Sequence, residues 1–146
     1  WRGRFTLIQK EPYVLMDGAH NPAAAQTLRD SLQIYFPGRR LHYVFGMFQD
    51  KDYPAVIALT APLAEHIITV ETPDNPRALP AKELAQAVAE VNPSVEAAAS
   101  IREAVHKSLQ RAEKDDVVVI FGSLSYLCEA EQAVESYQEE KAARQE

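Results

Sequence analysis

The run Val117-Val118-Val119-Ile120-Phe121 decides the fold of this chain. All of its residues are apolar, and most are β-branched and favour extended backbone. A strand with no polar face must be covered on both sides, which is typical of a strand inside a parallel sheet that lies between two layers of helices. We therefore expect strands and helices to alternate along the rest of the sequence.

Outward from this run, further apolar stretches have the composition of strands. The first two are separated only by a turn at Glu11-Pro12, so they should pair as a hairpin. The expected strands are 5–9, 13–16, 41–45, 67–70 and 94–98.

Amphipathic stretches between these strands predict helices. In 101–112 the apolar residues recur at i, i+3, i+4 and i+7, the spacing of one helix face. The other expected helices start near Pro22 and end at Pro37-Gly38, cover 54–63, open at Pro80, and run from Tyr126 with fraying after about Glu139. The expected apolar faces are Ala24, Leu28, Leu32 and Tyr35 in the first helix and Leu84, Val88 and Val91 in the one opening at Pro80.

This alternation predicts an α/β fold. It should have three layers: a mostly parallel sheet with an N-terminal antiparallel hairpin strand, and helices on both faces. In such sheets ligands bind in the loops that leave the carboxyl ends of the strands. These loops are 17–21, 46–52, 71–79 and 122–125, where the unusual polar residues of the chain also lie.

Composition narrows the class of protein. The 146 residues amount to one domain, and we expect 1–146 to be a single domain cut from a longer protein, since the chain starts at Trp1. The net charge of −6 argues against a nucleic-acid partner. No apolar run approaches the length of a membrane span, and no secretory signal is present. The single cysteine, Cys128, favours a reducing compartment, so we predict a cytoplasmic protein.

The most informative loop is Asp17-Gly18-Ala19-His20-Asn21-Pro22. A carboxylate, an imidazole and a carboxamide stand on one short turn before a helix, whose free N–H groups and positive dipole end suit a phosphate or carboxylate. The alternative is a helix cap, because Asp or Asn ahead of Pro is a common start signal.

The other loops have equally open interpretations. Lys51 lies between two aspartates in a segment that could also be a solvated cap, and Arg77 could clamp an anion or be a surface arginine. Gly122-Ser123-Leu124-Ser125 resembles a small anion nest, but an ordinary strand-to-helix turn would look the same.

Several familiar signatures are absent. The chain has neither G-x-x-x-x-G-K-[ST] nor G-x-G-x-x-G nor G-x-S-x-G, and its histidines lack metal-ligand spacing. The residues alone therefore indicate an α/β domain with a polar rim that suits an anionic ligand.

With these loops in view, the chain resembles the C-terminal domain of folylpolyglutamate synthase/dihydrofolate synthase, in the Mur ligase superfamily. Asp17-Gly18-Ala19-His20-Asn21-Pro22 carries most of the resemblance. The sequence departs at Trp1-Arg2-Gly3-Arg4, where the family usually has proline before the glycine. The other matching segments are Gly3-Arg4-Phe5, Gly46 to Asp52 ending in Asp50-Lys51-Asp52, Pro76-Arg77-Ala78-Leu79 and Gly122-Ser123-Leu124.

The resemblance implies an ATP-dependent amide ligase with a Rossmann-like C-terminal domain. Such an enzyme phosphorylates the carboxylate of folate or dihydropteroate to an acyl phosphate, which the amino group of L-glutamate attacks. The phosphate-binding loop, the Mg²⁺ ligands and a carboxylated lysine lie on upstream domains in this family. The resemblance therefore implies that this domain alone is inactive and supplies no metal ligand.

The resemblance also implies roles for individual residues. Arg4 would reach the ATP phosphates, and Asp17 would contact the nucleotide. His20 would be the catalytic residue, close to the reacting phosphate or the incoming glutamate, and Ser123 would contact that amino acid. Lys51 and Arg77 receive no role.

Two alternatives stay open. One is the C-terminal domain of a Mur ligase that acts on a cell-wall precursor, against which the folate-type D-G-A-H-N-P string argues. The other is a non-catalytic α/β interaction module that uses the same loops to bind a partner.

Overall fold

Strand β6 (Val117–Phe121) lies inside the sheet, as its composition predicts. The structure, a computed structural model, describes residues 5–145. All five side chains of β6 are fully buried. The strand pairs in parallel with β2 (Tyr13–Asp17) on one side and with β3 (Leu41–Phe45) on the other.

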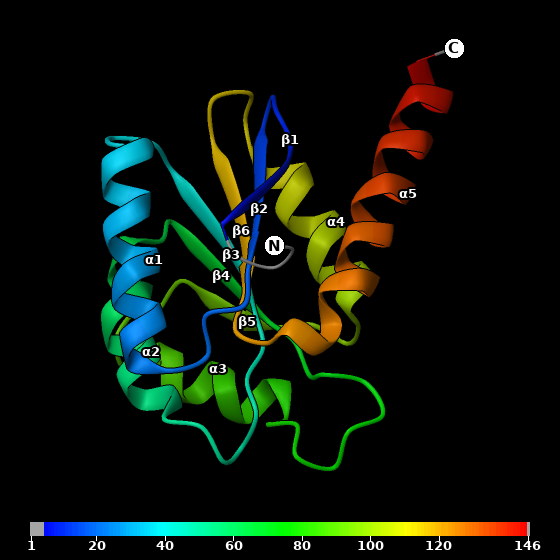
Figure 1. Ribbon diagram of the computed structural model, residues 1–146. Coiled ribbons are helices and arrows are strands. Elements are labelled where there is room, and N and C mark those ends of the chain that lie inside the picture. The colour runs from blue at the N-terminus through cyan, green and yellow to red at the C-terminus, as the bar shows by residue number, and fades with distance from the viewer. Residues whose placement is uncertain (1–4, 146) are drawn as a thin grey trace.

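The sheet has six strands in the order β1-β2-β6-β3-β4-β5 (Figure 1). Strand β1 (Thr6–Gln9) is antiparallel to β2 and forms the expected hairpin edge. Strands β4 (His66–Thr69) and β5 (Val95–Ala97) continue the parallel part of the sheet beyond β3.

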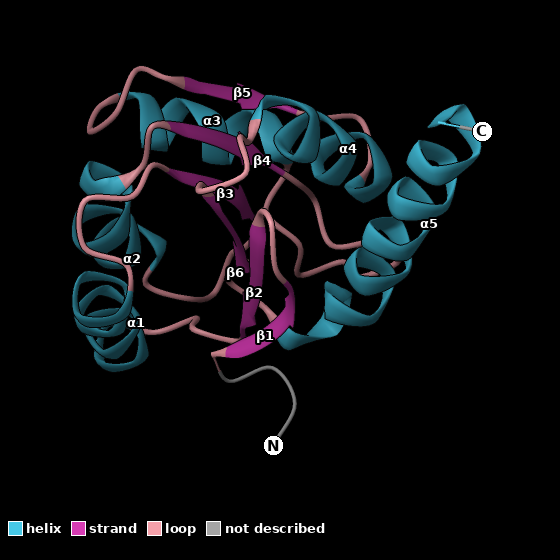
Figure 2. Ribbon diagram, turned by 90° about the horizontal axis from the view of Figure 1, so that it is seen from above, coloured by secondary structure: helices cyan, strands magenta, loops and turns pink. Residues whose placement is uncertain are grey.

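The direction of each crossover decides which face its helix covers. Helices α1 (Pro22–Tyr35), α2 (Tyr53–Thr60) and α3 (Ala81–Ala89) connect β2, β3, β4 and β5 in one direction across the sheet. Helix α4 (Ile101–Arg111) returns from β5 to β6. Because such crossovers are right-handed, the reversed direction places α4 on the opposite face, beside α5 (Leu127–Gln145), as Figure 2 shows. Two short 3₁₀ helices complete the chain, Ala61–Leu63 and Leu124–Tyr126.

Two hydrophobic cores lie on the two faces of the sheet. The core under α1, α2 and α3 includes Leu15, Tyr43, Phe45 and Phe121, and the Phe121 ring packs against those of Tyr43 and Phe45. The core under α4 and α5 is built on the alternate strand residues Val14, Met16, Val44, Ile68, Val118 and Ile120. The expected three-layer α/β fold is therefore confirmed.

Some local expectations are wrong. Tyr35, in the last turn of α1, is 65% exposed, and the buried face of this helix consists of Ala25, Leu28 and Leu32. Val91 is 42% exposed because α3 already ends at Ala89. Helix α5 continues to Gln145 without fraying after Glu139. Within residues 5–145, no helix is both long enough and apolar enough to cross a membrane.

Candidate functional site

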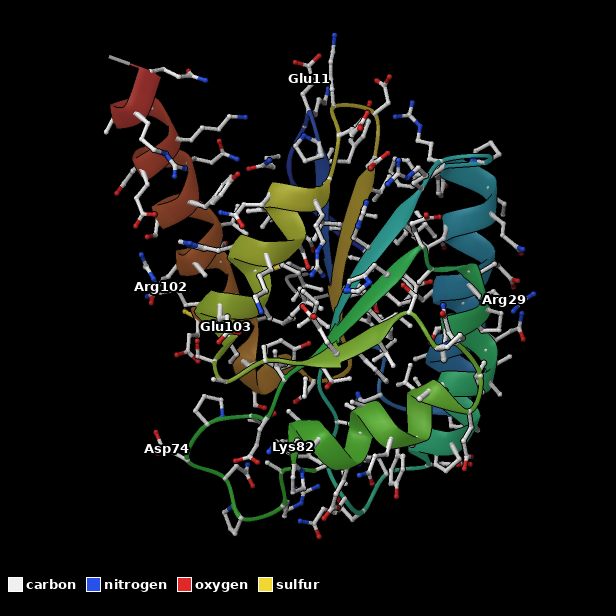
Figure 3. All side chains as sticks on the ribbon, turned by 180° about the vertical axis from the view of Figure 1, so that it is seen from behind. Glu11, Arg29, Asp74, Lys82, Arg102 and Glu103 are labelled. Atoms are coloured by element: carbon white, nitrogen blue, oxygen red, sulfur yellow. The ribbon has the colours of Figure 1, made fainter. Side chains whose placement is uncertain are left out.

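The polar loops gather at one end of the sheet, below the strands in Figure 1. Figure 3 shows Asp74, from the loop after β4, at the end opposite Glu11 of the β1–β2 turn. The chain leaves β6 toward the face of α5, whereas it leaves β2 and β3 toward the face of α1 and α2. A crevice opens where neighbouring strands send the chain to opposite faces, and this is where open α/β sheets bind ligands.

A cavity of about 410 Å³ occupies this position. All four loops that the sequence singles out contribute side chains to it, although they are far apart in the sequence. The described residues that line it are His20, Phe48, Lys51, Arg77, Ser123 and Ser125.

His20 is held in a defined orientation at this cavity. Its Nδ1 lies 2.7 Å from the carbonyl oxygen of Gly18. A carbonyl oxygen only accepts, so Nδ1 carries the proton and Nε2 is left for a ligand. The next residue, Asn21, caps α1 by accepting a hydrogen bond from the Ala24 amide at 2.8 Å. The hexapeptide thus provides both the helix cap and a side chain in the cavity.

Two glycines allow the loops after β3 and β6 to approach each other. Gly122 has φ +112°, and a Cβ atom built on it would lie 1.9 Å from the carbonyl oxygen of Gly46. A Cβ atom on Gly46 would lie 2.9 Å from Cγ2 of Val70. The close approach brings Ser123 to the cavity, where its hydroxyl is 2.7 Å from that of Ser125 and accepts the Ser125 amide.

The loops after β3 and β4 are joined by Arg77. Its Nη2 donates to both carboxylate oxygens of Asp50, at 2.8 and 3.0 Å, and its guanidinium lies 4.7 Å above the centre of the Phe48 ring. The Gln49 amide also donates to the Arg77 carbonyl oxygen at 2.7 Å. The hydrogen bond from Arg77 holds the pKa of Asp50 below its usual value. Arg77 is therefore a fixed cation whose charge Asp50 balances.

Lys51 contributes a charge that is not balanced in this way. It is half-buried at the cavity, and among residues 5–145 no carboxylate lies within ion-pair distance of its ammonium group. With His20 and the serine hydroxyls close by, the cavity offers a cation and several hydrogen-bonding groups. This combination suits a small anionic ligand with a carboxylate.

Asp17 lies at the end of β2 beside this cavity rather than among the described residues that line it. It is 9% exposed, and its carboxylate accepts the amides of Phe5 and Ala19, both at 2.8 Å. Arg4, the other residue assigned to the nucleotide, lies outside the described residues. The structure therefore places His20 and Ser123 at the same cavity. Asp17 instead accepts a hydrogen bond from the segment that enters β1.

Sequence reasoning missed two features of the site. Phe48 was not singled out, and the pairing of Asp50 with Arg77 could not be foreseen because nothing in the sequence says that their loops touch. The only available signal was that both loops leave carboxyl ends of strands.

His42 of β3 has a structural role away from the cavity. Its Nε2 lies 3.0 Å from Asp116 in the buried part of the sheet.

The described residues do not by themselves form a site for the divalent cation that the resemblance implies. Among residues 5–145, no three carboxylate, imidazole or thiolate side chains converge on a point where a metal could bind. Mg²⁺ does not fit here, and we assign no step to it on this domain.

Comparisons with known proteins match the sequence of this chain to a family. The family model described as Mur ligase, glutamate ligase domain, matches residues 3–124. A probable bifunctional folylpolyglutamate synthase/dihydropteroate synthase of Haloferax volcanii is 33% identical over 131 residues, which are 89% of this chain and 15% of that protein. A UDP-N-acetylmuramoyl-L-alanyl-D-glutamate--2,6-diaminopimelate ligase of Zymomonas mobilis is 34% identical over 122 residues, which are 82% of this chain and 24% of that protein.

Solved structures with a similar fold include enzymes of the same group. A solved bifunctional folylpolyglutamate synthase/dihydrofolate synthase with Mn, AMPPNP and L-glutamate bound has a TM-score of 0.80 and 27% identity, covering 92% of this chain and 32% of that one. The chain spans a third or less of the length of these relatives. It belongs to the Mur ligase family, as the glutamate ligase domain, and within that family it is similar to the folylpolyglutamate and dihydrofolate synthases.

Proposed function

We propose that this chain is the C-terminal domain of an ATP-dependent ligase that joins L-glutamate to folate or dihydropteroate. The observation that carries the proposal is the cavity in which Lys51, His20 and Ser123 meet at the carboxyl ends of the strands. A similar protein has been solved with Mn, AMPPNP and L-glutamate bound, which supports glutamate as the small anion.

The groups in the cavity suit the two parts of glutamate that matter in such a reaction, its carboxylate and its amino group. The Lys51 ammonium pairs with a carboxylate of glutamate, and the Ser123 hydroxyl donates a hydrogen bond to it. The free Nε2 of His20 faces the amino group, which must lose a proton as it attacks the acyl phosphate. Arg77 contacts the Phe48 ring directly and holds the loop that carries Lys51 through its hydrogen bonds to Asp50.

The nucleotide would lie between this domain and an upstream one. Arg4 contacts the ATP phosphates, and Asp17 lies next to the nucleotide. The phosphate-binding loop and Mg²⁺ ligands come from the upstream domain, so closure of the two domains completes the site. This division of labour fits the absence of a glycine-rich phosphate loop from the sequence.

The glutamate part of the proposal is tested with Lys51→Met in the full-length ligase. Loss of a charge-assisted hydrogen bond costs about 1.5–3 kcal/mol, so the KM for glutamate should rise roughly 10- to 100-fold. The matched control is Lys82→Met, because Lys82 is exposed on α3 at the same end of the molecule (Figure 3) and does not line the cavity. An unchanged glutamate KM in Lys51→Met would contradict the placement of glutamate in this cavity.

A second function has one observation in its favour. The diaminopimelate ligase of Zymomonas mobilis matches 82% of this chain, so a cell-wall branch of the family is the alternative. Assays of the full-length protein with dihydropteroate and folates, against muramyl substrates, separate the two branches. Asp17-Gly18-Ala19-His20-Asn21-Pro22 favours the folate branch.

A further inference from the structure

The two faces of the edge strand β1 are covered to different extents. On one face, Ile8 packs against the core under α4 and α5, and Gln138 of α5 donates to the side chain of Gln9 at 2.7 Å. On the face toward α1, Leu7 is 43% exposed, although its partner Leu15 on β2 is buried. Strand β1 forms the end of the sheet (Figure 2), so among residues 5–145 no further strand lies beside it on the outer side.

The exposed face of β1 borders an apolar groove of about 400 Å³ between this strand and the end of α1. We call it the β1–α1 groove. The described residues that line it are all aliphatic or aromatic: Phe5, Leu7, Leu15, Tyr35 and Phe36. The Phe5 ring packs 5.6 Å from that of Tyr35 and 6.4 Å from that of Phe36, so the groove is already formed in this domain.

Exposed large apolar side chains gather at this place. In the described part of the chain they are Leu7, Ile34, Tyr35 and Val91, and three of these four lie on β1 or in the last turn of α1. Single exposed apolar residues are normal on a soluble protein, whereas a group of them around a groove marks an interaction site. The β1–α1 groove is therefore a surface that another apolar group should cover.

We propose that the β1–α1 groove is the docking surface for the domain that precedes this one in the full-length ligase. This inference rests on the proposed function, in which this chain is the C-terminal part of a longer enzyme. The similar proteins are long enough to hold such a domain, since the match covers 15% of the Haloferax volcanii protein and 32% of the solved synthase. A tethered domain also needs little surface, because tethering gives an effective concentration in the millimolar range.

The position of the groove favours this occupant over a separate protein. Phe5 lines the groove and is the first described residue, so the preceding polypeptide joins this domain at the edge of the groove. The Phe5 amide donates to Oδ2 of Asp17 at 2.8 Å, and Asp17 is the residue that we place next to the nucleotide. An upstream domain that holds the other side of the nucleotide has to approach this part of the surface, where its apolar side chains can fill the groove.

Carbene footprinting with a diazirine probe tests the docking without any substitution. Labelling of Leu7 and Tyr35 should be at least about 3-fold lower in the nucleotide-free full-length ligase than in the 146-residue chain, because the centre of an interface excludes solvent. Val91 is the internal control, since it is 42% exposed and does not line the groove. Its labelling should be the same in both proteins. Equal labelling of Leu7 and Tyr35 in the two proteins would overturn the inference.

Leu7→Ser and Val91→Ser give a matched pair of variants, because the two side chains are 43% and 42% exposed. Leu7→Ser should lower the melting temperature of the full-length ligase by at least about 3 °C more than that of the 146-residue chain. Val91→Ser should lower both by the same amount. The difference between the two proteins removes the cost that each substitution has within this domain. Equal shifts for Leu7→Ser in both proteins would contradict docking in the groove.

Two other occupants give different footprints. If labelling of Leu7 falls as the concentration of the 146-residue chain is raised, the groove is covered by a second copy of this chain. If Leu7 and Tyr35 are protected in the full-length ligase only after ATP is added, the groove binds the nucleotide. Either result overturns the docking of the upstream domain. Neither depends on the glutamate KM of Lys51→Met, so a failure of the docking is distinguishable from a failure of the proposed function.

Discussion

Gly122 is the residue at which one added methyl group should cost most. Its φ of +112° disfavours any side chain, and the new Cβ atom would overlap the Gly46 carbonyl oxygen at 1.9 Å. We expect Gly122→Ala to lower the free energy of unfolding by roughly 3 kcal/mol or more, measured by urea denaturation.

Gly38→Ala is the matched control for this substitution. Gly38 also has a positive φ, +73°, but no atom lies within 4 Å of its ideal Cβ position. Only the backbone penalty applies, about 1–2 kcal/mol. Equal losses in the two variants would show that contact with Gly46 is not what requires glycine at 122.

His66 should make stability depend on pH. Burial beside α4 lowers the pKa of His66, with Arg111 and His42 acting in the same direction and Glu96 and Glu65 opposing them. The folded protein therefore keeps His66 neutral at a pH where the unfolded chain, with a pKa near 6.5, binds a proton. Stability should fall as the pH decreases below about 6.5, down to the folded pKa.

Urea midpoints at pH 7.5 and 5.5 measure this effect. His66→Gln can keep the contact that Nδ1 makes with Ser94 at 2.9 Å, but it does not titrate. The midpoint should therefore fall less in His66→Gln than in the original chain. A fall of the same size in both proteins would assign the pH dependence to other groups.

Single residues of the site were predictable to different degrees. The loops that carry His20 and Ser123 were singled out because polar residues of this chain follow apolar strands, a pattern visible without a structure, and the structure places both residues at one cavity. The roles of the two residues came from the family resemblance and stay predictions. The bond from Asp17 to the Phe5 amide was not, since it depends on the register in which β1 lies against β2.

At the scale of elements, buried strands were predicted best. The residues of β6 and β3 are apolar or buried on both faces, and such runs have few other interpretations. Helix ends were predicted less well, because Tyr35 and Val91 continue the apolar spacing of their helices although both side chains are exposed. Strand order could not be predicted, although it is what brings the loops after β2, β3, β4 and β6 together.

The last turns of α5 should be dispensable for stability. Arg102 of α4 holds Glu140 at 2.5 Å, but the side chains of this pair are 56% and 47% exposed. Exposed ion pairs contribute about 0.2–1 kcal/mol, so a chain that ends at Glu139 should unfold within about 1 kcal/mol of the full chain.

Tyr137 provides the comparison on the same helix. It is 9% exposed, and its ring packs against His106 of α4 with the ring centres 5.3 Å apart. Tyr137→Ala should cost about 3 kcal/mol or more in the same urea measurement. A truncation that costs as much as Tyr137→Ala would show that α5 is stabilised along its whole length.

At the scale of the whole molecule, our proposal gives the described domain one side of a catalytic cleft. In that proposal the cavity provides Lys51 for a carboxylate and His20 for a proton, and the sequence has no glycine-rich phosphate-binding motif. Two hydrophobic cores cover the two faces of the sheet, each under helices of this same chain. This chain should therefore be able to fold alone without being able to catalyse the reaction alone.

We expect the 146-residue chain to fold and to show no ligase activity, with at most weak affinity for ATP. The phosphates carry most of the charge by which proteins recognise ATP, and in our proposal the groups that would hold them lie upstream, apart from Arg4. Titration calorimetry checks this, with the full-length ligase as the positive control under the same conditions. A dissociation constant in the micromolar range for ATP and this chain alone would mean that the described domain carries a complete nucleotide site, and the division of the cleft between two domains would be wrong.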